Sequence, residues 1–173
     1  MSKESRPTNC DNFHNDVKIR KPIVEDGAKI WNLVKDTRVL DLNSAYNYLM
    51  LCKYFAETCV VAEYNEEIVG FLSAFHPQNS PEKIFIWQVA VDESQRGQGL
   101  GTALLKSLLK RKTCSGVNYL ETTITPSNTP SQSLFRGLAK MLDTHCEVLD
   151  CFSETMFPEK KHEDELLYRI GPF

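Results

Sequence analysis

The sequence lacks several features that would each point to a different class of protein. Apolar runs such as 58–62 and 104–109 fall far short of the roughly 20 residues that a membrane-spanning helix needs. The formal net charge of −3 gives no electrostatic reason to expect nucleic acid or an anionic membrane as a partner. The first 16 residues contain no apolar segment of the kind found in secretory signals. We therefore expect a protein of the cytoplasm with a small molecule as its partner.

The cysteines also lack the spacing of a metal site. There are six, at positions 10, 52, 59, 114, 146 and 151, and neither Cys-x-x-Cys nor zinc-finger spacing occurs. Several lie in apolar stretches, where free cysteine behaves as a small hydrophobic residue. Without an export signal, reduced thiols are expected. The sequence thus predicts neither a disulfide framework nor a bound metal.

Length and composition favour one globular domain. The chain has 173 residues, 42% of them hydrophobic, which is enough for a full core. The polar segment 1–16 is expected to be a flexible leader, followed by a single domain over 17–173. No internal repeat and no linker divides that domain.

The spacing of apolar residues predicts strands alternating with helices. Asp26 is expected to cap the first helix, around residues 30–34, and Asn65-Glu-Glu indicates a hairpin turn. Strands are expected at 17–20, 58–64, 68–75, 84–91, 119–124, 146–152 and 164–170, and further helices at 45–55, 99–112 and 131–141. This order predicts an α/β (α+β layered) fold, with a mixed central sheet flanked by helices.

The most informative segment begins at Ile84 and ends at Leu105. An apolar strand leads into Arg96-Gly-Gln-Gly99-Leu-Gly101 and then into an amphipathic helix. Glycines let the backbone turn with bare N–H groups, and a helix N-terminus adds partial positive charge. Such a cradle binds phosphate or pyrophosphate, although Gly-x-Gly alone fits a structural turn equally well. The segment has neither the Gly-Lys-Ser/Thr of a Walker A loop nor the acidic residue that completes a Rossmann fingerprint.

Arg96-x-x-Gly99-x-Gly101 after such a strand resembles the acetyl-CoA signature of the GNAT acyltransferases. Further blocks, above all Leu40-Asp-Leu-Asn-Ser and His162-Glu-Asp-Glu, resemble the L-2,4-diaminobutyrate acetyltransferases of ectoine biosynthesis. The resemblance covers nearly all of the chain after residue 17. It implies a GNAT-like fold, usually in a homodimer, and direct attack of a neutral amine on acetyl-CoA. The implied product is N-γ-acetyl-2,4-diaminobutyrate.

The resemblance also implies a set of acetyl-CoA contacts. In GNAT folds the strand before the glycine turn separates from its neighbour and offers unpaired backbone to the thioester and pantetheine. The glycine turn surrounds the pyrophosphate, and an asparagine approaches the pantetheine or adenylate. The implied cofactor residues are Val89, Ala90, Val91, Arg96, Gly97, Gln98, Gly99, Leu100, Gly101, Thr102 and Asn128.

Position 135 departs from the family pattern. Many GNAT enzymes place a tyrosine, acting as general acid, seven residues after the asparagine; here that residue is Phe135. A thiol has a pKa of only about 8.5, so the leaving thiolate needs no strong acid. Its proton is left to solvent, to another residue or to the substrate amine, and no acid is assigned.

A substrate with two ammonium groups and one carboxylate requires an acidic site. On local pattern Asp41 is equally a helix N-cap, and the acidic run 163–165 is a solvated charge cluster. The resemblance instead implies that Asp41 binds an amine and that His162 and Glu165 bind or deprotonate one.

Two aromatic residues complete the expected site. Tyr46, one turn inside the second helix, would hydrogen-bond the substrate, and Trp87 would offer its π face to an ammonium group. From the pattern alone, Tyr46 fits an ordinary helix surface and Trp87 fits the core of the sheet.

Two other functions remain open on the sequence. One is a GNAT enzyme that acetylates a polyamine or a protein amine. The other is a non-catalytic regulatory module that binds acyl-CoA, which the missing tyrosine at position 135 favours.

Overall fold

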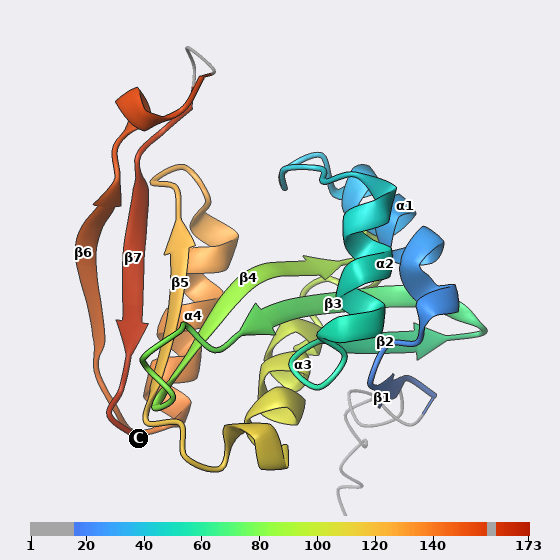
Figure 1. The fold of residues 1–173 in the computed structure, drawn as a ribbon, viewed down its shortest axis with the longest axis horizontal. Coiled ribbons are helices and arrows are strands. Elements are labelled where there is room, and N and C mark those ends of the chain that lie inside the picture. The colour runs from blue at the N-terminus through green and yellow to red at the C-terminus, as the bar shows by residue number, and fades with distance from the viewer. Residues whose placement is uncertain (1–15, 159–161) are drawn as a thin grey trace, which may run out of the picture.

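The computed structural model describes residues 16–158 and 162–173. Within them, seven strands form one sheet in the order β1-β2-β3-β4-β5-β7-β6, and helices lie on both of its sides (Figure 1). The predicted layered fold with a mixed sheet is therefore confirmed. Residues 1–15 of the expected leader lie outside the described residues.

The N-terminal half supplies three strands and two helices. They are β1 (Lys18–Arg20), α1 (Gly27–Thr37), α2 (Ala45–Tyr54), β2 (Val60–Tyr64) and β3 (Glu67–Phe75). Asn65 and Glu66 both have positive φ, 49° and 66°, as a tight two-residue hairpin turn requires. The predicted hairpin is confirmed.

The C-terminal half supplies four strands and two helices. They are β4 (Lys83–Val91), α3 (Leu100–Leu109), β5 (Tyr119–Ile124), α4 (Thr129–Met141), β6 (Cys146–Phe152) and β7 (Glu165–Ile170). The β4–β5 pair is parallel and the other strand pairs are antiparallel. The chain therefore crosses from β4 to β5 through α3, in the manner of a βαβ unit.

Asp26 is the N-cap residue of α1 as predicted, but its side chain makes no capping hydrogen bond to that helix. Its carboxylate instead accepts hydrogen bonds from the Arg20 guanidinium at 2.6 and 2.9 Å and from the Ile23 N–H at 2.8 Å. The carboxylate is taken by the Arg20 guanidinium because a charged donor binds it more strongly than a helix N–H does. Asp26 thus ties β1 to the start of α1.

A β-bulge in β4 lies next to the site described below. Ser73 of β3 pairs with Gln88, but the next residue, Ala74, pairs with Ile86. Trp87 is therefore an extra residue on β4 that pairs with no residue of β3. A bulge of this kind bends the strand and re-aims the side chains that follow it.

The bulge reverses the alternation of side chains along β4. Before it, Ile84 and Ile86 pack in the core formed with α3 and α4, whereas after it Val89 packs there and Ala90 joins the core formed with α1 and α2. Unbroken alternation would have sent Gln88 toward α3 and α4. Instead Gln88 faces the α1 and α2 side, where its amide finds its partners.

The strands β4 and β5 separate beyond the bulge. They pair from Lys83 opposite Tyr119 to Ile86 opposite Thr122, and no later pair joins them in the described residues. Figure 1 shows β4 turning away from β5 at this point. The backbone N–H and C=O groups on the β5 side of residues 87–91 are therefore free of the ladder.

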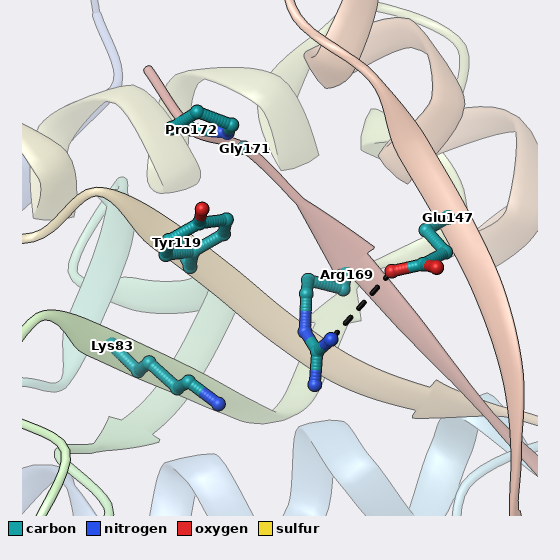
Figure 2. Close-up of a pocket in the computed structure, with 6 residues that line it drawn as sticks. All are labelled: Lys83, Tyr119, Glu147, Arg169, Gly171 and Pro172. Carbon is teal, nitrogen blue, oxygen red and sulfur yellow. Dashed lines mark ion pairs between the residues drawn. The ribbon is translucent and has the colours of Figure 1, made fainter.

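The helices cover the sheet unevenly. On one side, α1 and α2 lie over β2 to β4, and in the described part of the chain no helix lies over the same side of β5, β7 and β6 (Figure 1). A cavity of about 330 Å³ lies on that side at the far end of β5 and β7. Figure 2 shows Lys83, Arg169 and Glu147 around it.

The charges around this cavity are paired with one another. Lys83 Nζ and Arg169 Nε lie 3.1 and 2.7 Å from the same oxygen of Glu121, and Arg169 also lies 3.6 Å from Glu147. Burial raises the pKa of Glu121, but the bonds from Arg169 and Lys83 outweigh it and hold the pKa below its ordinary value. We regard this network as a brace across β4, β5, β7 and β6.

Candidate active site

A groove of about 340 Å³ lies where β4 and β5 separate. Val89, Ala90 and Val91 of β4 form one wall, and Asn128 at the start of α4 lies on the other side. These are four of the residues expected to contact acetyl-CoA. The free backbone of β4 and the apolar walls suit an extended chain that carries amide groups, because each amide can pair with the strand edge.

The glycine turn lies between Arg96, which lines this groove, and the start of α3. Gly97 and Gly99 have φ of 74° and 81°, a conformation that costs other L-residues roughly 1–2 kcal/mol. Gly99 is the N-cap of α3, and it offers no side chain to the first N–H groups of the helix. These donors, with the exposed Gln98 between the two glycines, have the arrangement that an anion cradle requires, and binding of the pyrophosphate there stays a prediction.

The residues after the turn serve packing as well. Leu100 is buried in the core, so only its backbone can reach a ligand, and Thr102 is half-buried. Gly101 has no positive φ; a Cβ there would lie 3.3 Å from Leu134 of α4. The prediction that Gly101 helps to turn the backbone is therefore wrong, and its role is to let α3 approach α4.

Arg96 lies at the groove and folds back onto β4. Its Nε donates to the carbonyl of Val91 at 3.1 Å, which fixes the entry to the glycine turn. The guanidinium is otherwise exposed, and an exposed cation beside the helix N-terminus adds to the positive potential there.

A second pocket of about 360 Å³ adjoins the groove. Asn128 borders both, as do Val39, Leu40 and Thr125. Four of the residues predicted to bind or deprotonate the substrate line this second pocket together: Asp41, Trp87, His162 and Glu165. We call it the polar pocket.

Glu165, the first residue of β7, has the chemistry of a base. Burial raises the pKa of its carboxyl group above the ordinary value; a hydrogen bond from Thr123 and the nearby His162 oppose this, and Asp41 adds to it. A carboxylate with a raised pKa in a cleft is better matched to proton abstraction near neutral pH than an ordinary one.

His162 is held in a defined orientation beside Glu165. Its Nδ1 lies 2.6 Å from the Glu163 carbonyl, which can only accept, so Nδ1 carries the hydrogen. In the neutral imidazole the lone pair is then on Nε2. The ring stacks on Phe157, with centroids 3.6 Å apart.

The structure decides between the two readings of Asp41 and of Trp87. Ser44 caps α2, with Oγ accepting from the Asn47 N–H at 3.2 Å, so Asp41 is not the cap. Trp87, at the bulge, is 44% exposed and so is not in the core of the sheet. Both side chains are available to a ligand.

The other acidic residues of the 163–165 run hold the structure. Glu163 accepts hydrogen bonds from the N–H and hydroxyl of Ser127. Asp164 accepts one from the Glu154 N–H at 2.7 Å. Of the three carboxylates, Glu165 is the one that lines the polar pocket.

Tyr46 does not line the polar pocket of this chain. It lies on the outer side of α2 and is 68% exposed. Phe135, in contrast, is buried in the core among residues of α3 and α4. Its apolar ring is fully accounted for by packing, and it supplies no acid.

Sequence reasoning missed several residues of the polar pocket. Asn43, Gln88, Thr123 and Thr125 also line it. Gln88 had a visible signal, because it is the polar residue in the apolar strand 84–91. The threonines had none, since which of them face the pocket depends on how β5 pairs with its neighbours.

The described residues contain no group of three or more His, Cys, Asp or Glu side chains placed to hold a metal ion. Among the helices of residues 16–158 and 162–173, none combines the length and the apolar character that a membrane crossing requires.

Comparisons with known proteins agree with this geometry. The sequence model of the acetyltransferase (GNAT) family matches residues 28–139. A putative acetyltransferase, yncA from Salmonella typhimurium, solved with acetyl-CoA, shares the fold at 16% identity, with a TM-score of 0.69 over 91% of this chain and 94% of that one.

More similar relatives define the group within the family. The L-2,4-diaminobutyric acid acetyltransferase of Marinococcus halophilus is 52% identical over 98% of both chains. That of Halalkalibacterium halodurans is 56% identical over 90% of this chain and 82% of the relative. The diaminobutyrate acetyltransferase EctA from Paenibacillus lautus, solved with L-2,4-diaminobutyric acid and coenzyme A, is 46% identical with a TM-score of 0.88, over 90% and 95%.

Fold, groove and glycine turn define a GNAT acetyltransferase. With relatives this similar along almost its whole length, the chain belongs to the L-2,4-diaminobutyric acid acetyltransferases of that family.

Proposed function

We propose that this protein transfers the acetyl group of acetyl-CoA to L-2,4-diaminobutyrate and releases free CoA, as a step of ectoine biosynthesis. The observation that carries the proposal is that Asp41, Trp87, His162 and Glu165 line one pocket that adjoins the β4–β5 groove. Two acidic groups and an aromatic face suit a dication, and the relatives named above act on the same compound.

The first chemical requirement is a neutral amine. An alkylammonium group has a pKa near 10.4, so removing its proton at pH 7 costs roughly 4–5 kcal/mol. Glu165, with its raised pKa, accepts this proton directly or through a water molecule. Nε2 of His162 is the second available acceptor. A second ammonium on the same small molecule lowers the cost further by charge repulsion.

The second requirement is stabilisation of the charge that develops on the thioester oxygen. The nitrogen lone pair attacks the carbonyl carbon, the N–C bond forms, and the oxygen becomes negative. Free N–H groups of residues 87–91, on the edge of β4 that faces the groove, are fixed donors for this oxygen. The C–S bond then breaks, the amide remains on the amine, and the thiolate takes a proton from solvent or from the attacking nitrogen.

We assign the γ-nitrogen as the nucleophile, following the family resemblance. The α-ammonium loses its proton more easily than the γ-ammonium, so selection of the γ-nitrogen depends on its placement in the pocket and not on intrinsic reactivity. Asp41 and Glu165 give the pocket two carboxylates. One can bind the ammonium that does not react while the other deprotonates the one that does.

Thiol release tests the proposal. Purified protein with acetyl-CoA and diaminobutyrate should release one CoA thiol for each amide formed, and NMR of the product should place the acetyl group on the γ-nitrogen. Absence of thiol release would defeat the proposal. Turnover of polyamines or of a peptide amine with diaminobutyrate inert would favour another GNAT substrate. CoA binding by calorimetry, without turnover of any amine, would favour a regulatory module.

We also propose that two copies associate. In the described residues no helix covers β5, β7 and β6 on the side of the sheet that carries α1 and α2 (Figure 1), and α2 exposes Tyr46 and Leu49, at 68% and 39%. The uncovered face of β5, β7 and β6 in one copy can receive α2 of a second copy, and the reverse, across a two-fold axis. Sedimentation analysis should give twice the mass of the chain, and a Tyr46→Glu variant should dissociate; a monomeric wild type would contradict the proposal.

The cytoplasm is the proposed compartment. The five cysteines of the described residues are free thiols, which is the usual state of cysteines where conditions are reducing. Fractionation of cells that express the protein should recover it with cytoplasmic markers, and recovery outside the cell would contradict the assignment.

A further inference from the structure

The segment that carries Asp41 has little structure of its own. Residues 38–44 connect α1 to α2 without a helix or strand, yet Asp41 must keep its carboxylate at the polar pocket. A single side-chain bond joins this segment to the sheet: Gln88 Nε2 donates to the Asp41 carbonyl at 2.8 Å. No other hydrogen bond of the described residues links 38–43 to a strand.

Gln88 is itself fixed by a buried tyrosine. The Tyr48 hydroxyl, on α2, donates to Gln88 Oε1 at 3.2 Å. Tyr48 is fully buried and Gln88 is 6% exposed, so the bond between them is shielded from water, and the bond from Gln88 to Asp41 is partly buried. A buried polar group that loses its partner costs about 1–3 kcal/mol, which makes this chain of bonds hard to open.

The direction of the two bonds requires an amide at position 88. The Asp41 carbonyl can only accept, so the NH₂ group of Gln88 faces it, and this leaves Oε1 to accept from the Tyr48 hydroxyl. Methionine has neither the donor nor a strong acceptor, and ionised glutamate can accept from Tyr48 but cannot donate to Asp41. The bulge at Trp87 is what brings residue 88 to this side of the sheet.

We propose that Gln88 is a positioning residue: it fixes the main chain of Asp41 at the polar pocket, and Tyr48 fixes Gln88. Its effect on the reaction passes through Asp41 and therefore falls on diamine affinity, not on acetyl-CoA affinity. The kinetic part of this inference rests on the proposed function; the structural part does not.

Four variants separate this role from a general loss of packing. Gln88→Glu keeps the acceptor for Tyr48 and removes the donor to Asp41, and should raise KM for diaminobutyrate about tenfold or more. Gln88→Met, which adds no charge, should do the same, and Tyr48→Phe should raise it about threefold. KM for acetyl-CoA should stay within twofold in each. Ser73→Ala is the control, because Ser73 is buried opposite Gln88 and its hydroxyl has no partner.

A double variant shows whether Gln88 acts through Asp41. Asp41→Ala alone should raise KM for diaminobutyrate, and adding Gln88→Met should raise it no further. If the two effects multiply instead, Gln88 contributes to the substrate independently and the positioning role is wrong.

Limited digestion with trypsin gives a readout that needs no substrate, because the segment holds one cleavable residue, the exposed Arg38. Cleavage after Arg38 should be about tenfold faster in Gln88→Met than in wild type, while Ser73→Ala should be cleaved at the wild-type rate. If wild type fails to acetylate diaminobutyrate, the proposed function falls while this measurement still decides the role of Gln88. Unchanged cleavage after Arg38 in both Gln88 variants would overturn the inference.

Discussion

The groove and the polar pocket share a border but are constructed differently. Along the groove, the edge of β4 beyond residue 86 has no partner strand, so it offers free main-chain groups beside the mostly apolar side chains of β4, of the 38–44 connection and of α4. The polar pocket is lined by residues of five separate segments: the 38–44 connection, the bulge of β4, the end of β5 with the residue after it, the start of α4, and residues 162–165 at the beginning of β7. Binding by main-chain groups survives most side-chain substitutions, whereas binding by side chains is weakened by substitution of any one of them.

This contrast matches the division of labour in the reaction. The acyl carrier is common to many acyltransferases and is recognised through general features such as phosphate and amide groups. The acceptor amine is particular to the enzyme and is recognised by charges at defined positions. Variants that act on one region and spare the other therefore test the comparison directly.

The largest effect is expected at Glu165. Glu165→Gln removes the proposed base and should lower kcat by at least about 100-fold, with KM for acetyl-CoA unchanged. Asp164→Asn is the matched control, because that neighbouring carboxylate bonds the Glu154 N–H away from the pocket. Steady-state thiol release measures both, and equal rates for the two variants would remove Glu165 from the mechanism.

A somewhat smaller effect is expected at Asp41. Asp41→Asn keeps the shape but removes the charge, and the loss of one charge-assisted hydrogen bond of roughly 1.5–3 kcal/mol should raise KM for diaminobutyrate about 10- to 100-fold. Asp36→Asn, an exposed position on α1, should leave it unchanged. A rise in KM for acetyl-CoA instead would show that the two regions are not separable.

The groove should respond to backbone strain. Gly99→Ala meets no atom within 4 Å but must adopt φ of 81°, at a cost of roughly 1–2 kcal/mol. We expect calorimetry to show CoA binding about 5- to 10-fold weaker, with diaminobutyrate binding unaltered. Gly116→Ala, which also has open space around it and no positive φ, should bind CoA normally; if it is equally impaired, strain is not the reason.

The smallest effect concerns pH and stability. Because burial raises the pKa of Glu165 in the folded chain, the folded state binds its proton more tightly than the unfolded state does. Glu165 therefore favours folding at low pH, and this contribution is lost as pH rises through the raised pKa. Glu165→Gln should raise Tm slightly at pH 7 but not at pH 4 in calorimetric scans. The wild-type rate should fall as pH drops through the same pKa.

The sequence predicted the elements well but not the side-chain contacts between them. Strands 119–124 and 146–152 have the predicted bounds, because period-two alternation is a local signal. Gly101 was misassigned because Leu134, which explains it, belongs to a later helix. Arg20 is near Asp26 in the sequence, but whether the two side chains meet depends on how β1 packs beside α1, which local pattern does not give. The resemblance selected four residues of the polar pocket, and the bulge shows why Gln88 belongs with them.

The parting of β4 and β5 has one more consequence. The two strands remain paired at residues 83–86 of β4, and the ion pairs of Glu121 stabilise that paired end. The point from which the strands separate is therefore fixed. The gap between the two strands narrows toward this paired end, so we expect it to limit how far an acyl group can enter. An acyl group longer than acetyl would then keep the thioester carbonyl too far from the amine to react.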